Sequence, residues 1–99
     1  MEQEIGFCTT SDGVSIAYAT ITDGEAPIVY ANGWPTQLDM EWEAPRSRGF
    51  LEALAQGCTL IRYDMRGTGL SERGVSDFSL PTLVKDLEAV VDHLDLNKV

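Results

Sequence analysis

CTLIRYDMRGTGLS, residues 58–71, joins a short apolar run to a loop that contains two glycines. The run lacks alternation of polar and apolar residues, which is typical of a strand buried on both faces. Gly67 and Gly69 permit the tight turn that follows it. The loop has no third glycine and no helix opens at Gly69, which argues against a nucleotide-binding loop. We therefore predict a structural loop, braced by Arg66 through Asp64 or nearby carbonyls.

A second apolar run without alternation, residues 27–31, lies upstream of this strand, and residues 43–56 between the two runs have a helical pattern. Pro45 suits the first turn of that helix, and Gly57 suits its end in a left-handed conformation. A strand, a helix and a strand in this order predict parallel pairing with a right-handed crossover.

The segments on either side complete an α/β pattern. Residues 4–10 and 14–21 are rich in β-branched and aromatic residues, and the Asp-Gly step between them favours an antiparallel hairpin. Residues 80–94 form an amphipathic helix, with Asp77 and Ser79 available as caps. Its predicted apolar stripe consists of Leu80, Leu83, Val84, Leu87, Val90, Val91 and Leu94.

The other face of this helix carries Asp86, Ala89 and the single histidine, His93, so we expect these residues to be exposed to solvent. His93 is then a poor candidate for a general base. Lys98 and Val99 resemble the start of a further strand, and a sheet that stops there leaves the strand at residues 27–31 as an uncovered edge.

Composition narrows the function classes. The chain has 99 residues, 43% of them hydrophobic, which suits one compact domain or part of one. Sixteen acidic and seven basic residues give a net charge of −9, which disfavours binding to nucleic acids and anionic membranes. Cys8 and Cys58 form no metal or redox motif, so we predict no metal and no cofactor. The first residues do not resemble a signal peptide, and a cytoplasmic protein is expected.

These features together resemble the N-terminal half of the α/β-hydrolase superfamily, and the resemblance covers essentially residues 1–99. Its most specific part is RYDMRGTGLS, residues 62–71, followed by the capped helix LPTLVKDLEAVVDHL, residues 80–94. The chain is especially similar to hydrolase-like domains found alone or attached to bacterial cyclase or helix-turn-helix regulator modules. The resemblance implies a sheet of strand order 1-2-4-3, with an antiparallel first hairpin, then parallel strands, and two helices.

In this superfamily the turn after the third strand supplies a backbone N–H to the oxyanion hole. Asn32-Gly33 takes the place of the usual His-Gly pair, so the resemblance implies that Trp34 is the donor and that Gly33 gives the substrate close access. Asn32 departs from the family's His. Trp42 is expected near the binding pocket, with the alternative that it only seals the first helix against the sheet.

Three acidic side chains, Asp39, Glu41 and Glu43, are expected near the same pocket mouth, where the ordinary interpretation is a solvated acidic loop.

The resemblance implies that residues 1–99 form a partial domain that lacks the nucleophile elbow and the later strands. The expected function is the N-terminal fragment of a serine-type hydrolase of esters or similar acyl substrates, inactive alone. One alternative is a fragment of an epoxide hydrolase or dehalogenase, whose nucleophile is an Asp. Another is a ligand-sensing or self-association module of a regulator. The expected partners are a small acyl substrate, and the complementary half or a second copy at the exposed third strand.

Overall fold

The computed structural model describes residues 2–31 and 37–95 of the chain. The described residues form four strands and three helices: β1 (Gln3–Thr9), β2 (Ser15–Thr22), β3 (Ala26–Tyr30), α1 (Leu38–Glu43), α2 (Pro45–Ala55), β4 (Cys58–Tyr63) and α3 (Leu80–His93). Among these helices, none is long and apolar enough to cross a membrane.

The strands form one sheet in the order β1-β2-β4-β3, which confirms the predicted topology. β1 pairs antiparallel with β2, β2 pairs antiparallel with β4, and β3 pairs parallel with β4. The first hairpin turns at Gly13, whose φ of 85° lies in the left-handed region that glycine adopts readily. Thr10 accepts the Val14 N–H through its side chain at 2.9 Å and closes the same turn.

The helical pattern predicted at residues 43–56 is split in the structure. α1 ends at Glu43, and Ala44 has an extended backbone with φ −75° and ψ 119° before α2 begins at Pro45. A proline disfavours the helical conformation in the residue before it, which explains the break. α2 then ends as predicted, with Gly57 at a φ of 75°. The structure therefore has three helices where two were expected.

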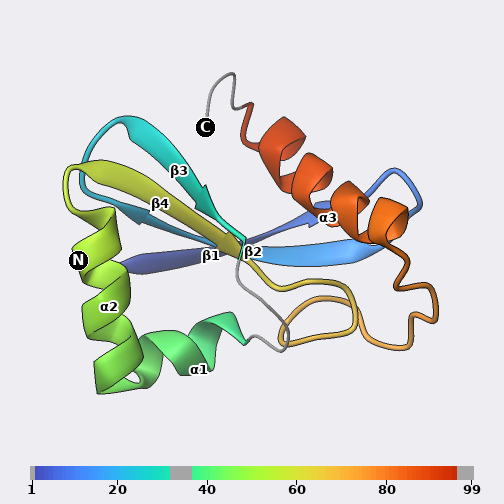
Figure 1. Cartoon of the computed structure of the whole chain (residues 1–99), viewed down its shortest axis with the longest axis horizontal. Helices are drawn as coiled ribbons and strands as arrows, with labels where there is room; N and C mark the ends of the chain where they lie inside the picture. Colours follow the sequence, from blue (N-terminus) through green and yellow to red (C-terminus); the bar gives the residue numbers. More distant parts are fainter. Residues whose placement is uncertain (1, 32–36, 96–99) are drawn as a thin grey trace.

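Helices cover both faces of the sheet. α3 packs over β1 and β2 on one face, whereas α2 packs over β2 and β4 on the other, and α1 precedes α2 (Figure 1). Successive side chains of the two inner strands, β2 and β4, point to opposite faces of the sheet. One core cluster consists of Cys8, Val14, Ile16, Ile61, Tyr63 and Val90; another consists of Ile21, Leu51, Ala55 and Leu60.

The predicted buried face of α3 is wrong in part. Leu80 is 75% exposed and Val84 is 43% exposed, whereas Asp86 is fully buried together with Thr82 and Val90. The carboxylate is drawn inward because it neutralises a buried arginine, as described below.

His93 is exposed, as predicted, but it does not lie on a face turned away from the sheet. Its ring centroid lies 5.5 Å from that of Tyr18 on β2. The strand expected to start at Lys98 and Val99 lies outside the described residues.

Candidate functional site

We expect the predicted site beyond the carboxyl ends of β3 and β4, which lie at the same edge of the sheet because the two strands are parallel. Three of the predicted site residues, Asn32, Gly33 and Trp34, lie outside the described residues, so their roles stay predictions. The structure does describe the residues that flank them in sequence, Tyr30 at the end of β3 and Leu38 at the start of α1, and the loop at residues 64–71 that follows β4.

Asp64 connects this loop to α1. Its side chain is fully buried, and its Oδ2 accepts hydrogen bonds from the backbone N–H of Leu38 at 3.3 Å and of Leu70 at 2.9 Å. One carboxylate oxygen therefore ties the first residue of α1 to the loop after β4. The sequence analysis had predicted Asp64 or nearby carbonyls as the partners of Arg66.

Arg66 pairs with two other carboxylates. Its guanidinium lies 2.8 Å from Oδ1 of Asp86 on α3 and 2.7 Å from Oδ2 of Asp12 in the β1–β2 turn. The Arg66 backbone N–H also donates to Asp86, at 3.0 Å. Asp12 lies 54 residues from Arg66 and Asp86 lies 20 residues away, so no local pattern in the sequence links the three.

Arg66 and Asp12 each shift the pKa of the other toward its charged form. The hydrogen bond from Arg66 holds the pKa of Asp12 far below its ordinary value, and a second hydrogen bond from Thr10 acts in the same direction. The pKa of Arg66 is raised, chiefly by the hydrogen bond to Asp12, although desolvation opposes the shift. Asp12 and Arg66 therefore stay charged at neutral pH, and their pairing fixes the loop.

Ser71 belongs to the loop framework. It is buried, its Oγ accepts the backbone N–H of Ala17 at 2.8 Å, and the hydroxyl donates to the carbonyl of Asp64. Both functions of the hydroxyl are therefore used in joining the loop to β2. This agrees with the interpretation of Ser71 as a loop residue rather than a nucleophile.

Arg62 on β4 binds two residues of α1 and so fixes this helix to the sheet. Only 1% of this residue is exposed, and its guanidinium donates to Glu41 at 2.8 Å, to Gln3 at 2.5 Å and to the carbonyl of Leu38 at 3.4 Å. The expected solvated acidic loop is thus a short helix, and Glu41 pairs with a buried cation. Leu38 is held at its N–H by Asp64 and at its carbonyl by Arg62.

Trp42 lies in α1 and packs against the cluster of Ile21, Leu51, Ala55 and Leu60. The guanidinium carbon of Arg48 lies 4.3 Å from the centre of its ring, which is a cation–π contact. This placement agrees with the alternative in which Trp42 seals the helices against the sheet. A role for Trp42 in binding stays a prediction.

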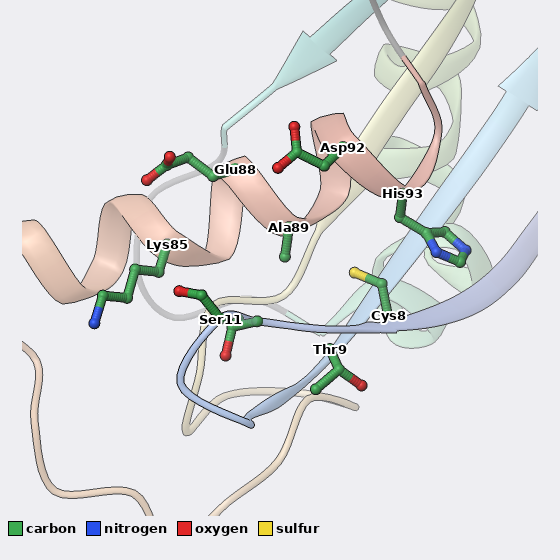
Figure 2. A pocket seen from close by; sticks show the side chains of 9 residues that line it. Cys8, Thr9, Ser11, Lys85, Glu88, Ala89, Asp92 and His93 are labelled. Atoms are coloured by element: carbon green, nitrogen blue, oxygen red, sulfur yellow. The ribbon is translucent and has the colours of Figure 1, made fainter.

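A cavity of about 440 Å³ lies between β1 and α3, at the opposite edge of the sheet from β3 (Figure 2). Cys8, Lys85, Asp92 and His93 are among its lining residues. Burial raises the pKa of the Cys8 thiol, and Asp86 adds to the shift, so the thiol is protonated at neutral pH and is a poor nucleophile. Within the described residues, no group of three or more His, Cys, Asp or Glu is placed to hold a metal ion.

Comparisons with known proteins place this framework in a family. Residues 26–99 match the family model described as alpha/beta hydrolase fold. A soluble epoxide hydrolase from Corynebacterium sp. is 36% identical over 88 residues, which are 89% of this chain and 28% of that protein. A bifunctional esterase/perhydrolase from Acinetobacter calcoaceticus is 32% identical over 91 residues, which are 91% of this chain and 31% of that protein.

A similar fold occurs in solved structures. A hydrolase from Pseudomonas aeruginosa is 31% identical, with a TM-score of 0.78, and the match covers 97% of this chain and 34% of that one. This chain thus spans about three tenths of the length of the curated relatives it matches. The family match covers residues 26–99 and the fold agrees with it, so the chain belongs to the alpha/beta hydrolase fold family.

Proposed function

We propose that this chain is the N-terminal part of a serine hydrolase that attacks the acyl carbon of an ester, and that it is inactive alone. The observation that carries the proposal is that this chain matches only part of the length of its hydrolase relatives. The esterase/perhydrolase from Acinetobacter calcoaceticus is matched along 91% of this chain but along only 31% of its own length. The remaining length is where we place a Ser nucleophile, its His and its acid.

The chain's own contribution is one half of an oxyanion hole. In this proposal the Trp34 backbone N–H donates to the oxyanion, and Gly33 allows the reacting carbonyl to approach the backbone closely. Asn32 occupies the position before this glycine. The described framework supports the idea, because Asp64 and Arg62 together fix both backbone groups of Leu38, where the chain returns from this segment.

An epoxide hydrolase is the second candidate. It is favoured by the 36% identity to the soluble epoxide hydrolase from Corynebacterium sp.. In that case the nucleophile would be an Asp in the same elbow, and the attacked atom would be an epoxide carbon. The residue at the elbow decides between the two candidates.

The test uses the longer protein that carries this segment, assayed with 4-nitrophenyl acetate and with styrene oxide. Ester turnover supports the first candidate, and epoxide opening supports the second. A Trp34→Pro substitution removes the donor N–H, and we expect kcat for the ester to fall by about 100-fold. Trp34→Phe keeps the N–H and should retain most of kcat. Equal losses in the two variants would contradict the backbone role of residue 34.

The 99-residue chain provides a second test. Without a nucleophile, it should hydrolyse 4-nitrophenyl acetate no faster than its own Trp34→Pro variant. Clear turnover that disappears in the variant would contradict the proposal that the chain is inactive alone.

A further inference from the structure

The chain contains two Asp-Gly steps in turns, Asp12-Gly13 between β1 and β2 and Asp23-Gly24 between β2 and β3. A residue with a hydroxyl group precedes the Asp in each case, so the two steps are similar in local sequence. An Asp followed by Gly is prone to isoaspartate formation, because Gly has no side chain to hinder the approach of its nitrogen to the Asp carboxyl group. A difference in reactivity between the two steps must therefore come from the fold.

The reaction joins the backbone nitrogen of the Gly to Cγ of the preceding Asp and releases water, which leaves a cyclic succinimide. Water then adds to either ring carbonyl. Addition at Cγ breaks the new N–Cγ bond and restores Asp. Addition at the backbone carbonyl breaks the peptide C–N bond and leaves isoaspartate, in which the main chain runs through the side-chain carbons. The first step needs a carboxyl group that can turn and be protonated transiently, and a Gly nitrogen that is not held elsewhere.

The Asp12-Gly13 step is held at each of these points. The Thr10 hydroxyl donates to Oδ1 of Asp12, and the Arg66 guanidinium donates to Oδ1 at 3.1 Å and to Oδ2 at 2.7 Å. The bond from Arg66 is the main reason why the pKa of Asp12 is lowered, so the protonated carboxyl group is rare. The Gly13 N–H donates to the carbonyl of Thr10 at 3.0 Å. Both reacting groups are therefore engaged in the folded chain.

The Asp23-Gly24 step is held more weakly. The exposed side chain of Asp23 accepts the Gly57 N–H at its Oδ2, at 2.8 Å. Among residues 2–31 and 37–95, no charged donor binds this carboxylate and no acceptor binds the Gly24 N–H. The carboxyl group can therefore reach the Gly24 nitrogen after the loss of one hydrogen bond to a neutral donor, and an exposed turn opens at a low cost in free energy.

We propose that Asp23 is a site of spontaneous isoaspartate formation in the folded chain, and that Arg66 protects Asp12 from the same modification. The product lengthens the main chain of the turn between β2 and β3, where the Thr59 hydroxyl donates to the Gly24 carbonyl at 2.6 Å. The modification therefore loosens the start of the parallel pair of β3 and β4. The proposal does not depend on the proposed hydrolase activity, because neither turn is assigned to that reaction.

The test is incubation of the 99-residue chain at neutral pH, in buffer and in urea. Digestion with endoproteinase Asp-N, which cleaves before Asp but not before isoaspartate, followed by mass spectrometry gives the modified fraction at each site. In buffer, isoaspartate should form about tenfold more slowly at Asp12 than at Asp23, because Asp12 must first lose hydrogen bonds to a charged group. In urea the two sites should react at similar rates, because their local sequences are similar. The site-resolved measurement keeps both apart from Asn32-Gly33, which yields the same product by loss of ammonia.

Arg66→Lys is the variant that tests the protection. It keeps a cation beside the buried Asp86 but lacks the planar group that binds both oxygens of Asp12. The rate at Asp12 should rise in this variant, while the rate at Asp23 stays unchanged and serves as the internal control. An unchanged rate at Asp12 would overturn the role of Arg66. Rates that rise together at both sites would mean that the variant unfolds, and the wild-type comparison then decides. Equal rates at the two sites of the wild type in buffer, or no modification of Asp23 in buffer, would overturn the proposal.

Discussion

Arg66 is a buried cation that joins three parts of the chain. Its side chain is 2% exposed and binds Asp12 in the first hairpin and Asp86 on α3, while it lies itself in the loop after β4. A buried ion pair gains little over an apolar pair, but removal of one partner leaves an uncompensated charge in the interior. The network is therefore more sensitive to loss of a single member than its net contribution to stability suggests.

For this reason Asp86→Ala should lower the free energy of unfolding by about 3–5 kcal/mol. That is a large share of the roughly 5–15 kcal/mol typical of a small domain. Urea denaturation followed by circular dichroism measures the change. Glu52→Ala is the control, because Glu52 forms an exposed i,i+4 pair with Arg48 at 3.8 Å and should cost about 0.5 kcal/mol or less. Similar losses in the two variants would contradict a special role for the buried network.

Two carboxylates with lowered pKa values predict the acid response. Arg66 lowers the pKa of Asp12, and the Ser79 N–H and the Thr82 hydroxyl lower that of Asp77. Below the ordinary Asp pKa of about 3.9, the unfolded chain binds more protons than the folded chain, so stability rises with pH in that range. We expect the stability contributed by these two groups to be present above about pH 4 and to be lost as the pH falls further.

Urea denaturation at a series of pH values between 7 and 2 tests this response. The Asp12→Asn variant should show a shallower fall in stability below about pH 4 than the wild type, because one of the two linked groups is gone. An unchanged slope would mean that the Asp12–Arg66 pair is not formed in solution.

The turn between β2 and β3 contacts the turn between α2 and β4 at one end of the sheet. A Cβ added to Gly24, in the turn between β2 and β3, would lie 2.3 Å from the carbonyl oxygen of Gly57, in the turn between α2 and β4. Asp23 accepts the Gly57 N–H at 2.8 Å, and Thr59 donates to the Gly24 carbonyl at 2.6 Å. The parallel pairing of β3 and β4 thus begins at a contact between two backbones.

Gly24→Ala should therefore lower the free energy of unfolding by about 1–3 kcal/mol, because the backbone of the neighbouring turn has to move. Gly49→Ala is a matched substitution in α2, where the added Cβ meets nothing within 4 Å, and it should raise stability by about 0.5–1 kcal/mol. Thermal unfolding of both variants gives the two signs. A neutral Gly24→Ala would show that the turns separate easily.

The sequence was sufficient for the elements whose signals are local. The Asp-Gly step predicted the first hairpin, Gly57 predicted the end of α2, and the two apolar runs predicted the parallel pair. The break before α2 also had a local signal, since Pro45 disfavours a helical Ala44. The prediction placed Pro45 in the first turn of a helix from residue 43, and so it missed the break between α1 and α2.

The interior charges were not predictable in this way. The helical period placed Asp86 on an exposed face, because periodicity counts apolar residues and carries no information on a distant Arg66. The pairing of Arg62 with Glu41 likewise depends on the fold of α1 against β4. Of the predicted site residues, Trp42 is partly buried against the core cluster under α2, and residues 32–34 lie outside the described part of the chain.

The described sheet has two open edges, β1 and β3. β1 and β3 are each hydrogen-bonded to one neighbouring strand, and each exposes an apolar side chain: Phe7 is 56% exposed and Ile28 is 47% exposed. An open strand edge is a template for pairing with another chain. The net charge of −9 on each copy opposes such pairing between identical chains, and salt weakens this repulsion.

We propose that β3 is the edge through which the chain associates, either with its complementary half or with a second copy. For the 99-residue chain alone, sedimentation equilibrium should then show stronger dimerisation in 0.5 M than in about 0.01 M NaCl. Ile28→Lys should weaken dimerisation by about tenfold or more, because a charged side chain would be buried at the new contact. Phe7→Lys introduces the same charge at β1 and should leave dimerisation nearly unchanged. Loss of dimers in Phe7→Lys but not in Ile28→Lys would assign the association to β1, and a monomer at every salt concentration would exclude association of the chain with itself.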